Sequence, residues 1–383
     1  MTQASDPRIE TLLAHGPGRD AASGGVVPPI QPSTTYFRNE DYALAADGHL
    51  YGRDDLPIPA DLDALLARLE GVADAIALPS GMAAIAAVFR AVPRGATVLI
   101  QSGIYWGTTG FLRQFCPKNG LGMVEVDATD AAMLAAAIAR EKPHLVFLEV
   151  PSNPWLRVAD IEAAAQAARA AGALLAVDAT VATPVHMKAA SLGADIVVHS
   201  ATKALNGHSD VLAGVVASDH VEADWWHAIR GERRQAGAML GPFEAWLLIR
   251  GLRTLALRAE RMAANAQAIA EFLAGHSKIE AVHYPGLKTH PDHALAISQM
   301  TGGFGGLLSF QIRGDAAATL AVAGRLELIT RATSLGGVES LIEHRQSVEP
   351  PETGMPENLL RLSVGIEHVD DLIADLNNAF AAI

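Results

Sequence analysis

The chain has 383 residues and a mass of 40.2 kDa, which at roughly 150 residues per domain predicts two to three structural units. Hydrophobic residues make up 50% of the chain and charged residues 19%, so it can bury a large core and is not disordered. The net charge of −13 argues against a general nucleic-acid binder and against a protein that rests on anionic lipid.

The N-terminus has neither a basic region nor an apolar region typical of a secretory signal. No apolar run reaches the roughly 18 residues expected of a membrane span. A single cysteine, Cys116, excludes an internal disulfide and any zinc site that needs two thiolates. We therefore expect a soluble cytoplasmic protein with neither nucleic acid nor a membrane among its partners.

The first half of the chain changes from irregular to periodic. Residues 24–36 (GGVVPPIQPSTTY) predict an extended arm, and residues 61–71 and 81–92 predict helices. Apolar strands then alternate with helical patterns; the predicted strands cover 96–100, 145–150, 172–178 and 194–200, and a helix covers 161–171. Continuous apolar strands separated by helices are typical of a mostly parallel sheet with helices on both faces, so we predict an α/β fold.

Beyond Gly241 the pattern predicts one long helix over 242–275, strands at 306–313 and 359–366, and a closing helix over 369–383. These elements indicate a second, smaller α+β domain. The expected division is an N-terminal arm over 1–53, an α/β domain over 54–242 and a C-terminal domain over 243–383.

Polar residues follow three of the predicted strands. Asn153 follows the second strand, Asp178 ends the third, and Ser200, Thr202 and Lys203 follow the fourth. The steps from 153 to 178 and from 178 to 203 are both 25 residues, the length of one strand–helix–strand unit. Because ligands bind at the carboxyl ends of parallel strands, we expect these side chains to line one edge of the sheet.

This combination favours pyridoxal phosphate. Lys203 offers an amine for a Schiff base, its neighbouring hydroxyls can hold a phosphate, and Asp178 can pair with a pyridinium nitrogen. Ser80, Gly81 and Met82 precede a helix, whose free N–H groups attract an anion. For each residue alone, a solvated surface side chain or a plain helix cap is the favoured interpretation; only the combination favours the cofactor.

The segment SATKALNGHSDVLAG (200–214) resembles the cofactor-lysine motif of the Cys/Met-metabolism pyridoxal-phosphate enzymes, the transsulfuration group. This group includes cystathionine β-lyase, γ-lyase and γ-synthase, methionine γ-lyase and the acylhomoserine sulfhydrylases. The resemblance extends to YGR (51–53), LEG (69–71), PSGMAAI (79–85), PSNP (151–154), GPFEAWLLIRGLRTLALR (241–258), SLGGVESLIEH (334–344) and LRLSVGIE (360–367). It implies the fold of type I pyridoxal-phosphate enzymes, which resembles aspartate aminotransferase.

The resemblance also implies roles for single residues. Lys203 would carry the cofactor and move protons, Asp178 would keep the ring nitrogen protonated, and Tyr105 would stack on the ring and assist proton transfer. Further cofactor contacts are implied for Ser80, Gly81, Met82, Asn153, Ser200 and Thr202.

Substrate and subunit contacts follow from the same resemblance. Arg361 would clamp the substrate α-carboxylate, helped by Asn153 and Ser334. Tyr51 and Arg53 would reach the phosphate of a neighbouring subunit, which implies a homotetramer built as a dimer of dimers with shared active sites. The chemistry needs no metal, and the histidines in HPDH (290–293) favour a surface turn over a metal site.

The sequence departs from the family towards the substrate end. Cystathionine γ-lyases and γ-synthases tend to have an acidic residue where Thr333 stands and an arginine where Gly110 stands. Their loss argues against a cystathionine γ-enzyme and allows a smaller or less charged substrate side chain. Ala179 replaces an asparagine and DDLPIP (54–59) replaces the usual stretch. Arg345 replaces a proline and precedes an unusual segment (346–357). Arg345 and Glu349 either contribute new specificity or, as favoured here, belong to a solvated loop.

We therefore expect a pyridoxal-phosphate carbon–sulfur lyase of cysteine and methionine metabolism that releases a thiol, ammonia and a 2-oxo acid. The alternatives are γ-replacement on an O-acylhomoserine and γ-elimination from methionine or another homoserine analogue. A non-catalytic binding protein is disfavoured because Lys203, Asp178, Tyr105 and Arg361 occur together. A nicotinamide dehydrogenase is disfavoured because no G-x-G-x-x-G follows an early strand.

Overall fold

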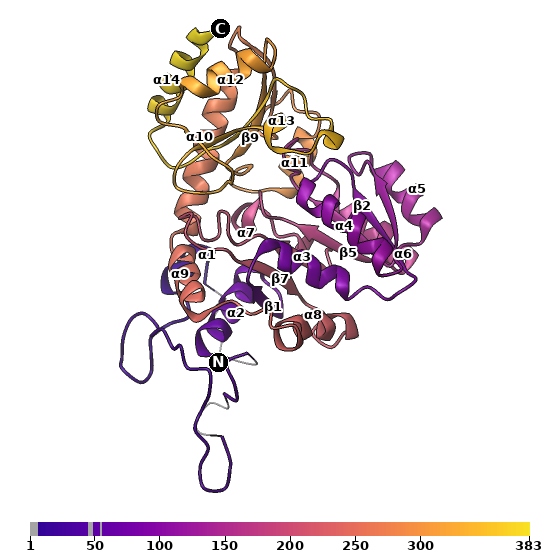
Figure 1. Cartoon of the computed structure of the whole chain (residues 1–383), viewed down its shortest axis with the longest axis vertical. Helices are drawn as coiled ribbons and strands as arrows, with labels where there is room; N and C mark the ends of the chain where they lie inside the picture. Colours follow the sequence, from indigo (N-terminus) through magenta and orange to yellow (C-terminus); the bar gives the residue numbers. More distant parts are fainter. Residues whose placement is uncertain (1–6, 45–48, 54–55) are drawn as a thin grey trace.

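The computed structural model describes residues 7–44, 49–53 and 56–383, with Ala382 described as backbone only. It contains two sheets with different strand arrangements (Figure 1). The larger sheet has seven strands in the order β1 (Asp74–Leu78), β7 (Gly214–Ser218), β6 (Ile196–His199), β5 (Leu174–Asp178), β4 (Leu145–Glu149), β2 (Thr97–Gln101) and β3 (Gly122–Val126). Of these strands, β7 alone runs opposite to the other six.

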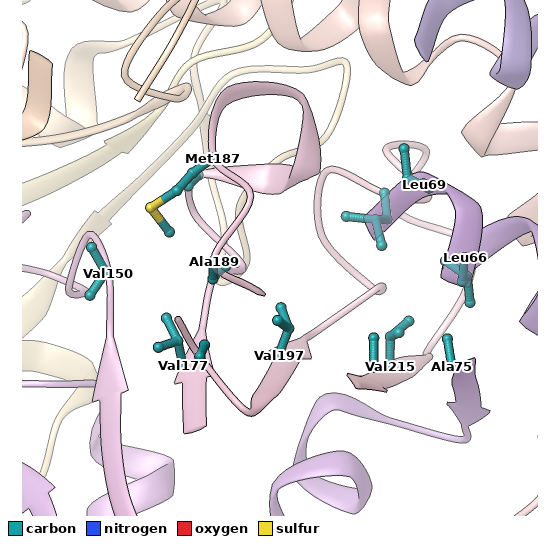
Figure 2. Packing of buried hydrophobic residues seen from close by; sticks show 14 of the residues in the cluster. Leu66, Leu69, Ala75, Val150, Val177, Met187, Ala189, Val197 and Val215 are labelled. Atoms are coloured by element: carbon teal, nitrogen blue, oxygen red, sulfur yellow. The ribbon is translucent and has the colours of Figure 1, made fainter. Parts of the chain in front are cut away.

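Successive residues of the large sheet point into two separate cores. Val177, Val197 and Val215 lie on one face, whereas Ala176 and Val198 lie on the other. Figure 2 shows the first face, where Ala75 of β1 faces Leu66 and Leu69 of the adjacent helix. The first core is covered by α2 (Pro57–Glu70), α5 (Ala131–Glu141), α6 (Ile161–Ala171) and α9 (Pro242–Leu252), and the second by α3 (Gly81–Arg90), α4 (Trp106–Lys118) and α8 (Asp224–Gln235).

The second sheet has five strands. Their order is β10 (Thr330–Arg331), β11 (Leu341–His344), β12 (Leu359–Ser363), β9 (Leu307–Ile312) and β8 (Ile279–His283), and only the β10–β11 pair is parallel. It packs against α10 (Leu255–Ala274), α12 (Ala316–Arg325) and α14 (Val369–Ala379). The shorter helices are α1 (Ile9–His15), α7 (Thr183–His186), α11 (His293–Gln299) and α13 (Arg345–Val348), with 3-10 turns at Ala190–Leu192, Pro351–Thr353 and Phe380–Ala382.

The α/β fold with a mostly parallel sheet and a smaller second unit is confirmed. The four predicted strands of the first half correspond to β2, β4, β5 and β6, although strands β1, β3 and β7 were not predicted. The single helix expected over 242–275 is wrong. Arg253 keeps helical dihedral angles but Thr254 does not (φ −115°, ψ 7°), so α9 and α10 are separate helices.

Helix α10 runs through both cores. Leu255 and Ala259 belong to the core of the large sheet, whereas Ala266 and Ile269 belong to that of the small sheet. Figure 1 shows this helix passing from one half of the molecule into the other. The division at residues 53 and 242 stays a prediction, because α9 also packs into the first core.

The N-terminal segment has little regular structure besides α1. In Figure 1 its indigo trace leaves the body as extended loops, closed by single bridges from Thr35 to Tyr51 and from Arg38 to Leu44. Large apolar side chains on it are exposed, among them Val26 (67%), Phe37 (76%) and Tyr42 (77%). Within the described residues, no helix is long and apolar enough to span a membrane.

Candidate active site

A cavity of about 330 Å³ opens where the parallel strands end. Both halves of the molecule contribute to its wall. The predicted site residues in the wall are Ser80, Gly81, Met82, Tyr105, Asn153, Asp178, Ser200, Thr202, Lys203, Ser334 and Arg361. The equal spacing of Asn153, Asp178 and Lys203 therefore does bring the three residues to one site.

Lys203 lies in the loop after β6, and its Nζ donates a hydrogen bond to Ser334 Oγ at 2.9 Å. Burial, together with the positive charge of Arg361, lowers the pKa of Lys203 to about 8. A larger fraction of the amine is therefore neutral near physiological pH than for a solvated lysine. A neutral amine is the form that attacks a carbonyl carbon.

Asp178 is the last residue of β5, and Glu149 is the last residue of β4 directly beside it. Thr180 donates two hydrogen bonds to Asp178 Oδ1, from its hydroxyl at 2.5 Å and from its backbone at 3.0 Å. Burial raises the pKa of Asp178, although the Thr180 bonds and His199 oppose this shift. A bound cation would be strongly favoured next to such a buried carboxyl group.

Glu149 is a site residue that the sequence analysis missed. It accepts hydrogen bonds from the backbone N–H groups of Tyr105 (3.1 Å) and Asn153 (2.6 Å), so it ties together two loops of the cavity wall. Burial and the neighbouring Asp178 raise the pKa of Glu149 to about 8. Its only signal was a charged residue at the end of the apolar run LVFLEV.

The N-terminus of α3 and the loop after β6 meet closely. Ser80 caps the helix by accepting a hydrogen bond from the Ala83 N–H at 3.1 Å. A Cβ on Gly81 would lie 2.7 Å from Ser200 Cβ and 2.8 Å from its Oγ, so only glycine permits this approach. Helix N–H groups and hydroxyls converge here, as a phosphate requires, and the residues present therefore fit pyridoxal phosphate.

Arg361 projects from β12 of the small sheet. Its Nη1 donates to Asn153 Oδ1 at 3.1 Å, and its Nη2 donates to the Ser334 carbonyl at 3.0 Å and lies 2.9 Å from Glu343 Oε2. Its buried Nε has no hydrogen-bond partner among the described residues. Burial and the nearby Arg345 lower the pKa of Arg361.

The interpretation of Arg345 and Glu349 as part of a solvated loop is wrong. Their side chains are 2% and 3% exposed, and both nitrogens on one edge of the Arg345 guanidinium bond Glu349. Arg345 also pairs with Glu343 and lines the cavity. Its long side chain extends inward from the N-terminus of α13, which the polar sequence after it did not indicate.

The other unusual positions lie in different environments. Thr333 lines the cavity, whereas Gly110 on α4 lies outside its wall, with open space around the position of a Cβ. Ala179 is fully buried behind Asp178. Of the DDLPIP segment, Asp54 and Asp55 lie outside the described residues, and the rest leads into α2.

Tyr51 and Arg53 are not brought to the cavity of their own chain. Both lie on the N-terminal arm, where the Arg53 guanidinium carbon lies 5.3 Å from the centre of the Tyr51 ring. Their role as contacts to a neighbouring subunit stays a prediction.

HPDH contains the expected turn, at Pro291 and Asp292, but the expectation that the segment lies at the surface is wrong. His290 is 5% exposed, and burial lowers its pKa to about 4. The adjacent Asp292 forms a 2.6 Å ion pair with Arg157. The segment is therefore part of the packing between α11 and the loop after β4.

A second missed residue, Arg258 of α10, supports the loop that carries Lys203. Its guanidinium donates to the carbonyl groups of Ala204 (2.7 Å) and Leu205 (3.3 Å), which directly follow Lys203. It also donates to the Gly251 carbonyl at 2.7 Å. Arg258 is the last residue of the segment GPFEAWLLIRGLRTLALR, which resembles the family. The resemblance drew attention to the segment but did not indicate that Arg258 contacts the loop of Lys203.

A lysine and a buried carboxyl group at the ends of parallel strands, with a helix N-terminus beside them, define a site of the pyridoxal-phosphate class. The model of one family, the Cys/Met metabolism PLP-dependent enzymes, matches residues 10–381. The chain therefore belongs to this family, and it is an enzyme with pyridoxal phosphate as its cofactor.

Relatives with different activities match almost end to end. The L-methionine gamma-lyase of Pseudomonas putida is 39% identical over 97% of this chain and 96% of its own. The cystathionine beta-lyase of Lactococcus lactis subsp. cremoris is 39% identical over 97% and 98%. The crystal structure of cystathionine gamma synthase from Xanthomonas oryzae pv. oryzae, in complex with aminoacrylate and cysteine, superposes with a TM-score of 0.93, at 38% identity over 98% of both chains.

Proposed function

We propose that the protein is a carbon–sulfur lyase that acts on a sulfur-containing amino acid and releases a thiol, ammonia and a 2-oxo acid. The observation that carries the proposal is that Lys203, Asp178 and Arg361 reach one cavity from two different sheets. An amine, a buried acid and a guanidinium are the groups needed to hold the cofactor and the carboxylate of an amino acid.

The residues that would hold pyridoxal phosphate fall into three groups. Lys203 would bind through its amine, Asp178 would pair with the ring nitrogen, and Tyr105 would stack on the ring. Ser80, Gly81, Met82, Ser200 and Thr202 would hold the phosphate, with Asn153 beside the ring. When bound, the cofactor supplies an electron sink for the charge left when a proton leaves the substrate Cα.

Arg361 would bind the substrate carboxylate. Its buried Nε lacks a partner among the described residues, and an unsatisfied buried donor costs roughly 1–3 kcal/mol. A carboxylate on this nitrogen would recover that free energy and orient the Cα. Lys203, whose pKa is already low, would then accept the Cα proton and return it elsewhere.

We propose elimination in preference to γ-replacement because Thr333 is uncharged. Cystathionine γ-synthases tend to have an acidic residue at this position of the cavity wall. The alternatives, γ-replacement on an O-acylhomoserine and γ-elimination from methionine or a related homoserine analogue, use the same residues up to loss of the Cα proton. The substrate test is therefore a panel of cystathionine, methionine, homocysteine, cysteine and O-acylhomoserines. Pyruvate from cystathionine would indicate β-elimination, whereas 2-oxobutyrate would indicate the γ route.

The class of the reaction has its own test. The purified protein is expected to show an absorbance band near the visible edge that is lost in Lys203→Ala. The proposal is wrong if the protein binds no pyridoxal phosphate or if the Lys203→Ala variant has unchanged turnover.

We also propose that the protein works as a cytoplasmic homotetramer whose arm completes a neighbouring active site. The exposed apolar side chains of the arm, and the absence of Tyr51 and Arg53 from the cavity wall of their own chain, support this. Mixing inactive Arg53→Ala and Lys203→Ala proteins should restore part of the activity, because a hybrid pair contains one intact site. Mixtures that stay inactive, or a monomer by light scattering, would contradict the proposal.

A further inference from the structure

Four buried charged side chains form a chain beside the cavity, and three of them, Arg361, Glu343 and Arg345, line its wall. Arg361 pairs with Glu343, Glu343 pairs with Arg345, and Arg345 pairs with Glu349. Each side chain is at most 5% exposed. The two arginines and two glutamates sum to zero charge, so any change at one of them alters the electric potential at the others.

The centre of this chain is a single oxygen. Glu343 Oε2 accepts a hydrogen bond from Arg345 Nη1 and lies 2.9 Å from Arg361 Nη2, whereas Glu343 Oε1 is buried with no partner among the described residues. The two guanidinium groups therefore compete for one carboxylate. The more strongly Arg345 holds Glu343, the less strongly Glu343 holds Arg361.

Glu343 also lies next to a donor that a substrate would need. A carboxylate binds a guanidinium bidentately through two adjacent N–H groups. Arg361 Nη2 donates to the Ser334 carbonyl and lies 2.9 Å from Glu343 Oε2. A carboxylate that approaches the orphaned Nε would therefore meet the negative charge of Glu343 beside the adjacent Nη2, and this charge opposes its binding.

We infer that Arg345 is a positioning residue that sets the affinity of Arg361 for the substrate α-carboxylate, and that Glu349 opposes its effect. Arg345 draws Glu343 away from Arg361 and adds positive potential to the carboxylate site. Glu349 reduces both effects by neutralising Arg345. The inference rests on the proposed role of Arg361, and it concerns a position where the family commonly has a proline.

Two single variants should act in opposite directions. Arg345→Met leaves the four-residue set with one net negative charge and should weaken carboxylate binding about tenfold. Glu349→Gln keeps an oxygen acceptor for Arg345 but leaves one net positive charge, and should strengthen binding about threefold. The double variant is neutral again and should return close to the parent value.

The probe is glycine, which carries the α-carboxylate and the amine but no leaving group. Its Kd for the holoenzyme is measured from the change in cofactor absorbance, alongside cofactor content and the unfolding temperature. Arg233→Met is the matched control, since it breaks another buried ion pair, with Asp63, that lies outside the cavity wall. It should lower the unfolding temperature and leave the Kd of glycine unchanged.

A purely structural network would show damage in both single variants and more damage in the double variant. That result, or equal Kd values throughout the series, would overturn the inference. Should Arg345→Met not fold, Arg345→Pro replaces it, because this residue is the first of α13, where proline is tolerated. Arg361→Met separates the two levels: an unchanged Kd there means that the proposed role of Arg361 is wrong, whatever the other variants do.

Discussion

Glu149 and Asp178 lie directly opposite one another as the last residues of two neighbouring parallel strands. Both are buried, and burial raises the pKa of both. Two adjacent buried carboxyl groups resist simultaneous ionisation, so one of them holds a proton near neutral pH in the cofactor-free protein. A cation at Asp178 would relieve the conflict, which gives the site a preference for a positively charged ring.

The first prediction concerns the stability of the cofactor-free protein. The pKa of Glu149 rises from 4.5 to about 8 on folding, so between these values the folded state binds more protons than the unfolded state. The free energy of unfolding should therefore fall as pH rises through this interval. Glu149→Gln should flatten the fall, measured as the midpoint of urea unfolding at several pH values. If stability falls equally steeply with pH in both proteins, Glu149 is not the group whose raised pKa causes the fall.

The second prediction concerns the attachment of pyridoxal phosphate. Because the pKa of Lys203 is about 8, the amine becomes fully neutral at lower pH than an ordinary lysine with a pKa of 10.5. The rate of attachment to the cofactor-free protein should rise as pH approaches about 8 and level off above it. Rapid mixing with absorbance detection measures the rate. A rate that keeps rising until the pH nears 10.5, the pKa of an ordinary lysine, would show that burial does not lower the pKa of Lys203.

The third prediction uses the close approach of α3 to Ser200. Gly81→Ala places a methyl group where Ser200 lies, which should push the two segments apart and weaken pyridoxal-phosphate binding about tenfold. Equilibrium dialysis measures the affinity. Gly110→Ala is the control, since open space surrounds that position on α4, and it should leave the affinity unchanged. Equal affinities for both variants would show that Gly81 does not contribute to the phosphate site.

The fourth prediction tests the far end of the cavity. Thr333→Glu combined with Gly110→Arg adds a negative charge at the cavity wall and a positive charge on α4. These charges suit the distal ammonium and carboxylate groups of cystathionine. The ratio of kcat/KM for cystathionine to that for methionine should rise about tenfold. If the ranking of the two substrates does not change, the distal end of the pocket lies elsewhere.

The sequence was sufficient to locate the residues that follow parallel strands. Chain connectivity and strand length determine where Asn153, Asp178 and Lys203 lie, so counting residues was enough. Arg361 on β12 of the small sheet and Ser334 in the loop before β11 reach the same cavity, and these were found by resemblance alone. Their distance from Lys203 in the chain exceeds anything that local periodicity encodes.

The residues that the sequence did not reveal depend on tertiary contacts. Glu149 ends an apolar strand, and its partners are backbone groups, which leave no mark in the sequence. Arg345 stands in a polar, proline-rich segment that suggested solvent, yet Glu343 and Glu349 bury its charge. Strand β7 escaped prediction because its short apolar run follows directly on the irregular loop after Lys203.

Helix α10 gives the two halves of the molecule a common mechanical element. Since one continuous helix is packed into both cores, neither sheet can lose its packing without exposing part of the other's. Arg258 on this helix bonds the loop of Lys203, so loosening the small sheet would also disturb the reactive amine. This helix therefore helps to maintain the spacing between Lys203 and Arg361, and we expect the two halves to unfold as one cooperative unit.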